Sequence, residues 1–200
     1  MAHKPRSEMI AETRAKLIAA ARRAFGTVGY TEASMDDFTA EAGLTRGALY
    51  HHFGGKEGLL KAVIAELDAE MADRQNGISA RYSDPWEGFV HECIAYIEMA
   101  LEPEIQRIML RDGPAVLGDP YNWPNQSGCI RSLTASLSRL AGEGLIDVED
   151  PEATARMISG ASLHASLWIA NADDPPAASK RAVAAFKRLL EGLRTGRNRD

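Results

Sequence analysis

The sequence predicts an all-α fold, and three observations point to it. Apolar residues recur at spacings of three and four nearly throughout the 200-residue chain, as expected where each helix buries one face. The pairs Asp84–Pro85, Asp150–Pro151 and Asp174–Pro175 each place an acidic N-cap before a proline at the first helical position, which is typical of a helix start. No internal repeat, low-complexity segment or long linker interrupts the pattern. We therefore expect helices joined by short connections.

Three helices are expected near the N-terminus. The first ends near Gly29 and carries a buried stripe of Ile10, Leu17, Ala21, Phe25 and Val28. Ser34 and Asp37 resemble a capping box that opens a short second helix, which stops at Gly43. Thr45 is the predicted N-cap of a third helix, and the Gly-Gly pair that follows ends it.

A fourth helix is predicted from Lys56 to about residue 75, with an apolar face of Leu60, Val63, Ile64, Leu67 and Met71. After it, the three Asp-Pro pairs each start a helix. A short helix is expected around residues 105–110, and Ile130, Leu133, Leu137 and Leu140 mark another. The stretch "GPAVLGDPYNWPNQSG" between these two is rich in Gly and Pro and is predicted to be a loop.

The composition is that of an ordinary soluble globular protein, with 45% hydrophobic and 26% charged residues. The two cysteines, Cys93 and Cys129, form neither a disulfide framework nor the spacing of a metal site. The N-terminus lacks the apolar run of a signal peptide, and no stretch approaches the roughly 20 apolar residues that a membrane span needs. We expect a cytoplasmic protein without a membrane partner.

Charge is distributed unevenly along the chain. The net charge is -5, yet residues 1–65 hold nine Lys and Arg against seven Asp and Glu, while residues 66–200 hold fourteen against twenty-one. A mildly basic N-terminal part on an acidic remainder indicates that only the N-terminal part meets a polyanion. We place the domain boundary after residue 55, between an N-terminal domain of residues 1–55 and a C-terminal domain of residues 56–200.

The two short helices, separated by the turn "GLT", have the spacing of a helix-turn-helix motif, whose second helix enters the major groove of DNA. Arg46, in the first turn of that helix, suits a bidentate pair with guanine O6 and N7. Gly47 and Ala48 are small enough to let the backbone approach base edges. Tyr50 and Lys56 suit phosphate oxygens, and Lys56 lies at a helix N-terminus that favours an anion.

The stretch "AARRAFGTVGYTEASMDDFTAEAGLTRGALYHHFGGKEGLLKAVI" resembles the DNA-binding domain of the tetracycline-repressor (TetR) family of bacterial transcription regulators. The resemblance covers about residues 10–65 and combines the "F...GY..AS" approach, the helix-turn-helix and the "KEGLL" start of the next helix. One departure is Gly58, where a helix-favouring charged residue is more usual, so the local helix is expected to be less stable. The resemblance implies phosphate contacts from Tyr50 and Lys56 and base contacts from Arg46, Gly47 and His51.

Two adjacent histidines end the third helix. Neighbouring residues point about 100° apart on a helix, so His51 and His52 are not expected to share a metal ion, and no metal site or cofactor is predicted. We assign His51 to a base or phosphate and His52 to the DNA backbone, or alternatively to a cap on the domain core. Ser34 and Thr45 are caps that also suit phosphate contact, Thr45 more so.

Other cations are secondary candidates for phosphate contact, because most charged helix faces are merely solvated. Lys16, Arg22 and Arg23 lie on the first helix, and Lys4 and Arg6 precede or open it and suit contact near the minor groove.

For the C-terminal domain, the resemblance implies a helical bundle that binds a small-molecule effector and forms a homodimer. Large or polar-tipped side chains among aliphatic stripes are candidates for an effector pocket lined mostly by apolar groups, although an aromatic or Met stripe at helical spacing is usually plain core packing. These candidates are Trp86, Phe89, Tyr96, Met99, Met109, Trp123, His164 and Trp168.

The last two helices carry small residues and an apolar stripe, which are suited either to the protein's own core or to a four-helix seam between two copies. The candidate seam residues are Met157, Gly160, Ala161, His164, Val183, Phe186, Leu190 and Leu193.

The function expected from these features is that of a dimeric DNA-binding transcriptional regulator that recognises a palindromic double-stranded operator. A repressor released by a hydrophobic or amphipathic ligand is the first hypothesis, and a DNA-binding dimer without an effector pocket is the second. An all-helical enzyme is a third, which the sequence does not favour because it contains no nucleophile elbow, phosphate-binding glycine loop or zinc-protease motif. No catalytic residue is assigned.

Overall fold

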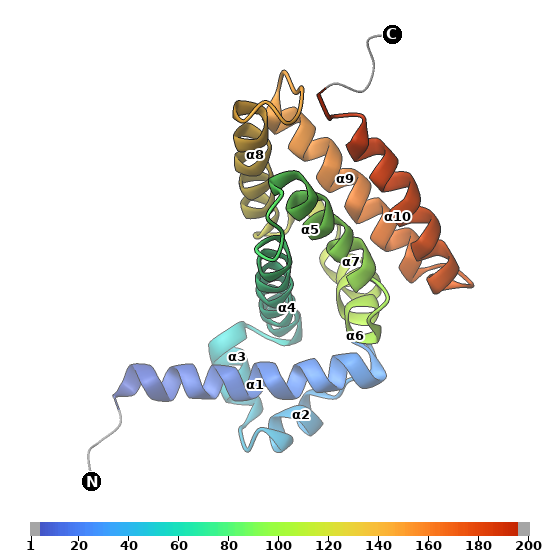
Figure 1. Ribbon diagram of the computed structural model, residues 1–200. Coiled ribbons are helices and arrows are strands. Elements are labelled where there is room, and N and C mark those ends of the chain that lie inside the picture. Colours follow the sequence, from blue (N-terminus) through green and yellow to red (C-terminus); the bar gives the residue numbers. More distant parts are fainter. Residues whose placement is uncertain (1–4, 196–200) are drawn as a thin grey trace. The chain divides into compact units, whose positions relative to one another are not determined.

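The computed structural model of the chain describes residues 5–195 and confirms the all-α fold. The described part has no strand beyond a single bridge between Ile146 and Arg194. It forms two compact units (Figure 1). The first unit runs to Leu67 and includes Pro103–Asp119, and the second unit contains Asp68–Glu102 and the chain from Pro120 onward. No helix among the described residues is long and apolar enough to cross a membrane.

The first unit begins with α1 (Arg6–Val28), α2 (Met35–Glu41) and α3 (Arg46–Phe53), followed by the start of α4 (Lys56–Ser79). The two predicted N-caps are confirmed. The Ser34 hydroxyl accepts from the Asp37 amide at 3.4 Å, and the Thr45 hydroxyl accepts from the Ala48 amide at 3.2 Å. Their contacts satisfy amides that the first turn of a helix leaves without a backbone partner.

An aromatic cluster holds this unit together. The Phe25 ring of α1 lies 6.0 Å from Phe38 of α2 and 5.5 Å from Tyr30. Phe25, Phe38 and Leu49 are almost fully buried, so each of the first three helices contributes to the same core. Burial of these side chains positions α3 and leaves its opposite face exposed.

The segment from residue 103 to 119 belongs to the first unit, although it lies far along the chain. It consists of α6 (Pro103–Ile105), a π-helical stretch, η1 (Gln106–Asp112), and α7 (Gly113–Leu117). The compact units therefore do not divide at residue 55, where the sequence suggested a domain boundary. The expected loop from Gly113 is in part helical, because Pro114 occupies the second position of α7, where a missing amide costs nothing.

The second unit contains α5 (Pro85–Met99), α8 (Gln126–Gly142), α9 (Pro151–Ala170) and α10 (Pro175–Glu191). Within it, α9 packs against α8, α10 and α5 (Figure 1). The helices expected at the Asp-Pro pairs are confirmed, and each aspartate accepts a backbone amide of its helix at 2.8 to 3.0 Å. The largest side chains of the core include Trp86, Ile97, Leu137, Leu140 and Ile169.

Candidate nucleic-acid interface

The turn between α2 and α3 fixes the angle of the second helix. Gly43 has a φ of 67°, in the left-handed region that favours glycine, and its amide bonds the carbonyl of Ala40 at 2.9 Å. The next amide, of Leu44, bonds the carbonyl of Thr39 at 2.8 Å. Leu49 then anchors α3 in the core with no exposed surface. This local geometry is that of a helix-turn-helix with one free face on α3.

The face of α3 opposite Leu49 carries the predicted DNA contacts. Arg46, Gly47 and Tyr50 are exposed, with 53% of Tyr50 accessible, and Ala48 is half-buried. Because Gly47 has only its own N-cap hydroxyl near the place of a Cβ, the backbone there is open to close approach. These residues present a guanidinium, a phenol and a stretch of bare backbone on one helix, as contact with DNA requires.

The two histidines occupy different environments. His51 is exposed and His52 is half-buried, with ring centroids 5.1 Å apart at a steep angle. The carbonyl of His52 accepts a bond of 2.8 Å from Arg14 of α1, whose guanidinium also lies 4.4 Å from the Phe53 ring centroid. Arg14 thus ties the C-terminal end of α3 to α1, a structural role that the sequence reading missed.

Arg46 makes the most specific contact on this face. Its Nε and Nη2 donate to the two carboxylate oxygens of Asp36 in the first turn of α2, and the Nη2–Oδ2 distance is 2.6 Å. Hydrogen bonding and the negative charge of Asp36 raise the pKa of Arg46 above its ordinary value. Both side chains are more than half exposed, so the pair is on the surface that faces solvent.

Lys56 is the first residue of α4 and lies beside the end of α3. Its Nζ donates to the carbonyl of Thr31 at 3.3 Å and lies 4.6 Å from the ring centroid of Tyr30. Partial burial lowers its pKa, and nearby Glu32 opposes that shift. Lys56 is held in a defined place next to the exposed face of α3, and it needs no large movement to meet a phosphate there.

Two of the other cations proposed for phosphate contact, both on α1, have acidic partners. Lys16 pairs with Glu12 at 3.2 Å, and Arg23 pairs with Glu41 at 2.6 Å. Arg6 is exposed at the start of α1, and Lys4 lies outside the described residues. Among the residues that the structure describes, no group of His, Cys, Asp and Glu side chains is arranged to hold a metal ion.

A polar clasp joins the segment 103–119 to α1 and the residues after it. Arg22 donates to both carboxylate oxygens of Glu104 at 2.8 and 2.9 Å. Arg107 donates to the carbonyl of Thr27 at 2.5 Å, and Asp112 accepts the Tyr30 amide at 2.7 Å. No periodicity in the sequence signals these contacts, which join residues about eighty positions apart.

The candidate effector residues fall into three groups. Trp86, Phe89 and Met99 are buried on α5, and Met109 is buried in the first unit. His164 and Trp168 are exposed on α9, and the Arg181 guanidinium lies 5.3 Å from the Trp168 ring centroid. Tyr96 and Trp123 remain, and both are half-buried in the second unit.

Tyr96 lies near polar groups inside the second unit. Burial raises the pKa of the Tyr96 phenol, and Asp68 and Tyr121 add to the shift. Burial also raises the pKa of Asp68, whose carboxylate accepts from Asn125 at 3.0 Å. Two residues before Asn125, the indole Nε1 of Trp123 is buried without a hydrogen-bond partner within the described chain. A buried unpaired donor is costly and therefore marks a place where a bound acceptor would be stabilised.

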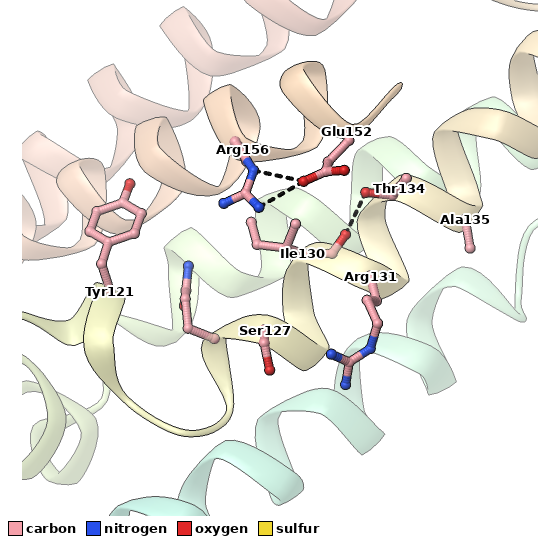
Figure 2. A pocket seen from close by; sticks show the side chains of 9 residues that line it. Tyr121, Ser127, Ile130, Arg131, Thr134, Ala135, Glu152 and Arg156 are labelled. Carbon is pink, nitrogen blue, oxygen red and sulfur yellow. Dashed lines mark hydrogen bonds and ion pairs between the residues drawn. The ribbon is translucent and has the colours of Figure 1, made fainter. Parts of the chain in front are cut away.

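A separate pocket of about 680 Å³ opens between α8 and α9. Figure 2 shows Arg156 bonded to Glu152 of the same helix, α9, on one side of the pocket and Tyr121 on another. None of the eight candidate effector residues lines this pocket. Most of its lining residues have polar side chains, among them Gln126, Ser127, Arg131 and Thr134.

The candidate seam residues differ in accessibility within one chain. Met157 is 75% exposed and His164 is exposed on the same helix, whereas Phe186 and Leu190 are buried inside the second unit. Gly160 faces Tyr121, whose hydroxyl would lie 2.6 Å from a Cβ placed there. The remaining three, Ala161, Val183 and Leu193, are half-buried.

Comparison with known protein families finds matches in both halves of the chain. Residues 17–63 match the family described as "Bacterial regulatory proteins, tetR family". Residues 86–193 match "Tetracyclin repressor-like, C-terminal domain". The second match alone spans more than half of the chain.

Individual relatives agree with the family matches. The HTH-type transcriptional repressor AcnR of Corynebacterium glutamicum is 30% identical over 142 residues, which are 70% of this chain and 71% of AcnR. The HTH-type transcriptional regulator SrpR of Pseudomonas putida is 45% identical over 108 residues, or 51% of this chain and 47% of SrpR.

Solved structures extend the likeness to the whole fold. A TetR-family transcriptional regulator from Pectobacterium atrosepticum has a TM-score of 0.89 and 48% identity, covering 98% of this chain and 100% of its own. RolR in complex with resorcinol has a TM-score of 0.67 at 20% identity, covering 94% of this chain and 90% of RolR. At that identity the likeness to RolR concerns the fold alone.

Proposed function

The chain belongs to the TetR family and is a sequence-specific DNA-binding transcriptional regulator, and from this premise we propose that it is a homodimeric repressor released from its operator by a small ligand. The observation that supports the DNA-binding part most directly is the exposed face of α3, which carries Arg46, Tyr50 and His51. We propose that it acts in the bacterial cytoplasm, where its DNA lies.

In the proposed complex, α3 lies in the major groove. Arg46 reads a guanine, His51 contacts a base or a phosphate, and Tyr50 and Lys56 bond phosphate oxygens. Thr45 is placed to add its hydroxyl at the N-terminus of α3, where backbone amides attract an anion. Two copies related by a two-fold axis would present two such helices about 34 to 36 Å apart, which requires a palindromic operator.

The proposed effector site combines Asp68 and Tyr96 with Trp123, which lies two residues before Asn125, the hydrogen-bond partner of Asp68. The Trp123 N–H is buried without an acceptor, and the half-buried Asp68 carboxylate can accept further bonds beside the one from Asn125. A hydroxyl group supplies both an acceptor and a donor. We therefore propose a small, mainly apolar molecule that carries at least one hydroxyl, a class that includes the resorcinol bound by RolR.

The polar clasp is the proposed route of communication. The segment 103–119 is joined at both ends to helices of the second unit, while Glu104 and Asp112 hold it to the DNA-contacting unit. A ligand that changes the preferred position of this segment would shift the two copies of α3 away from one DNA turn. A hundredfold loss of operator affinity needs only about 2.7 kcal/mol of coupling.

The decisive experiment is selection of bound duplexes from a random DNA pool by the purified protein. Wild-type protein is expected to enrich a palindrome, and Tyr50→Ala to lose the enrichment. Tyr82→Ala is the matched control, since Tyr82 is also exposed but stacks on His91 in the second unit. Enrichment of no sequence at low salt, where phosphate contacts are strongest, would contradict the proposal.

The ligand part is tested on the selected operator. Hydroxylated aromatic compounds, resorcinol among them, are screened for release of DNA and for quenching of tryptophan fluorescence. Trp123→Phe keeps an aromatic ring and removes the N–H, and is expected to weaken binding of an active compound by about five- to fiftyfold, the value of one buried hydrogen bond. A compound that releases wild-type and Trp123→Phe protein equally would remove Trp123 from the proposed site. Operator binding that no compound affects would favour the alternative of a dimer without an effector pocket.

A further inference from the structure

The most specific contact in the DNA-contacting unit that the family resemblance does not assign is the pair between Asp36 and Arg46. Asp36 lies in the first turn of α2, and Arg46 opens α3 ten residues later. The guanidinium donates through Nε and Nη2, one N–H to each carboxylate oxygen. This side-on arrangement fixes both the position and the plane of the guanidinium.

The side-on pair leaves the Nη1–Nη2 end of the Arg46 guanidinium available for a base. A guanidinium has five N–H donors in one plane, and the pair with Asp36 uses Nε–H and the adjacent N–H of Nη2. The two parallel N–H bonds at the end of the group, one from Nη1 and one from Nη2, point away from the carboxylate. Those are the bonds that guanine O6 and N7 accept together. The carboxylate and a guanine therefore fit the same arginine at the same time.

Stability alone does not account for the pair. The Arg46 and Asp36 side chains are 54% and 64% exposed, and ion pairs this accessible contribute little to folding. An exposed carboxylate bonded to Arg46 of α3 also repels phosphates that approach that helix, which weakens binding to any sequence. The carboxylate thus lowers the affinity for DNA of any sequence and at the same time preorganises the arginine that reads a base. Both effects raise the ratio of specific to non-specific binding.

We infer that Asp36 is a specificity-determining residue, which holds Arg46 in the orientation that reads one guanine in each operator half-site. This inference rests on the proposed base-reading role of Arg46. The expected contribution is roughly two- to tenfold in discrimination per half-site, which corresponds to the cost of ordering one long side chain on binding.

The experiment compares Asp36→Asn with Asp37→Asn. Both replace an exposed carboxylate in the first turn of α2 by an isosteric amide, and no ion pair joins Asp37 to another described residue. Affinities are measured on two DNAs, the selected operator and a changed version of it. In the changed version, the position at which Arg46→Ala loses its base preference carries A·T in place of G·C in both half-sites. Thermal unfolding of each variant checks that the fold is retained.

The measured quantity is the ratio of the affinity for the G·C operator to the affinity for the A·T version. Asp36→Asn is expected to lower this ratio by about two- to tenfold per half-site, while Asp37→Asn leaves it unchanged. Both variants are expected to bind non-specific DNA more tightly, because each loses one negative charge. In the Arg46→Ala background, Asp36→Asn is expected to have no further effect on the ratio, since its partner is gone.

Two results would overturn the inference alone, with the proposed function intact. One is an equal ratio for Asp36→Asn and Asp37→Asn on an operator that Arg46→Ala does relax. The other is tighter binding of Asp36→Asn to the guanine operator with an undiminished ratio, which would make the carboxylate a competitor of the base. If Arg46→Ala relaxes no position, the base-reading role itself fails, and the inference fails with it.

Discussion

Gly58 offers a prediction whose sign is opposite to the one that helix propensity suggests. It lies in the first turn of α4, where replacement by alanine would ordinarily stabilise the helix by about 0.5 to 1 kcal/mol. In the structure, however, a Cβ at Gly58 would lie 1.8 Å from the carbonyl oxygen of Phe53, the last residue of α3. Observed Cβ contacts lie beyond 3.0 Å, so the two helix ends would have to separate by at least about 1.2 Å. Glycine at this position, where the family usually has a charged residue, is thus explained by close packing and not merely by a weaker helix.

The expected free-energy change combines the two effects. Overpacking against backbone costs about 1 to 3 kcal/mol, so after subtraction of the propensity gain Gly58→Ala is expected to be less stable than wild type by up to about 2.5 kcal/mol. This corresponds to a melting temperature lower by up to roughly 10 °C for a chain of this size. Operator affinity is also expected to fall, because the shift moves Lys56 away from the end of α3.

Gly77→Ala is the matched control for this prediction. Gly77 lies in the same helix, and no atom lies within 4 Å of the place that its Cβ would take. Its replacement is expected to raise stability by about 0.5 to 1 kcal/mol and to leave operator affinity unchanged. The assay is denaturant or thermal unfolding of both variants beside wild type. An increase in melting temperature for Gly58→Ala as large as that for Gly77→Ala would refute the reasoning.

Three further predictions follow from particular contacts. Lys56→Ala removes two of the proposed phosphate contacts from the proposed dimer and is expected to reduce the slope of log affinity against log salt by about 1.8. Lys61→Ala is the control, because Lys61 pairs with Glu57 of its own helix at 2.8 Å, and it is expected to leave the slope unchanged. Titrations by fluorescence anisotropy from about 50 to 200 mM salt distinguish the two outcomes. Burial raises the pKa of Asp68 in the folded protein above its value in the unfolded chain. The folded protein therefore binds this proton more tightly than the unfolded chain does, and its stability falls as pH rises through the raised pKa. Asp68→Asn is therefore expected to melt above wild type at pH 7.5, with the gap closing towards about pH 4, and a gap independent of pH would contradict this. Glu104→Gln weakens the pair with Arg22 by about 1 to 2 kcal/mol and is expected to speed amide exchange in residues 103–112, measured by mass spectrometry against wild type.

Features determined within a few residues were predictable from the sequence. Each helix cap depends on one side chain and an amide two or three positions away, as at Ser34, Thr45 and the Asp-Pro pairs. The residue types are therefore enough to predict the caps. Leu49 and Phe53 are four residues apart, a spacing that puts them on one face of α3, and Leu49 is fully buried, so the neighbouring Tyr50 points to the exposed side. The candidate DNA-contacting face is therefore largely a local property of α2, α3 and the turn between them.

Features that depend on distant contacts were not predictable. The clasp through Glu104 and Asp112 joins residues 82 positions apart in the chain, and no periodicity encodes such a pairing. The pair of Asp36 with Arg46 crosses a turn, and its partners are ten residues apart, outside the helical spacings that sequence reading tests. The close approach of Gly58 to Phe53 depends on the angle between two helices, which the sequence does not express directly.

The same contacts change the argument from net charge. Residues 1–65 have two more basic than acidic residues, but the first unit as folded includes Glu66 and the segment 103–119, and it then holds eleven Lys and Arg against eleven Asp and Glu. Several of those cations are held by acids within the unit, including Arg22, Arg23 and Arg46. The net charge of the first unit therefore provides no overall electrostatic attraction to DNA. Affinity must come from a few placed groups on and beside α3, and such a protein depends more on base contacts and less on counterion release than a highly basic one. This is the setting in which one carboxylate, placed to orient one arginine, has a measurable effect on the choice of operator.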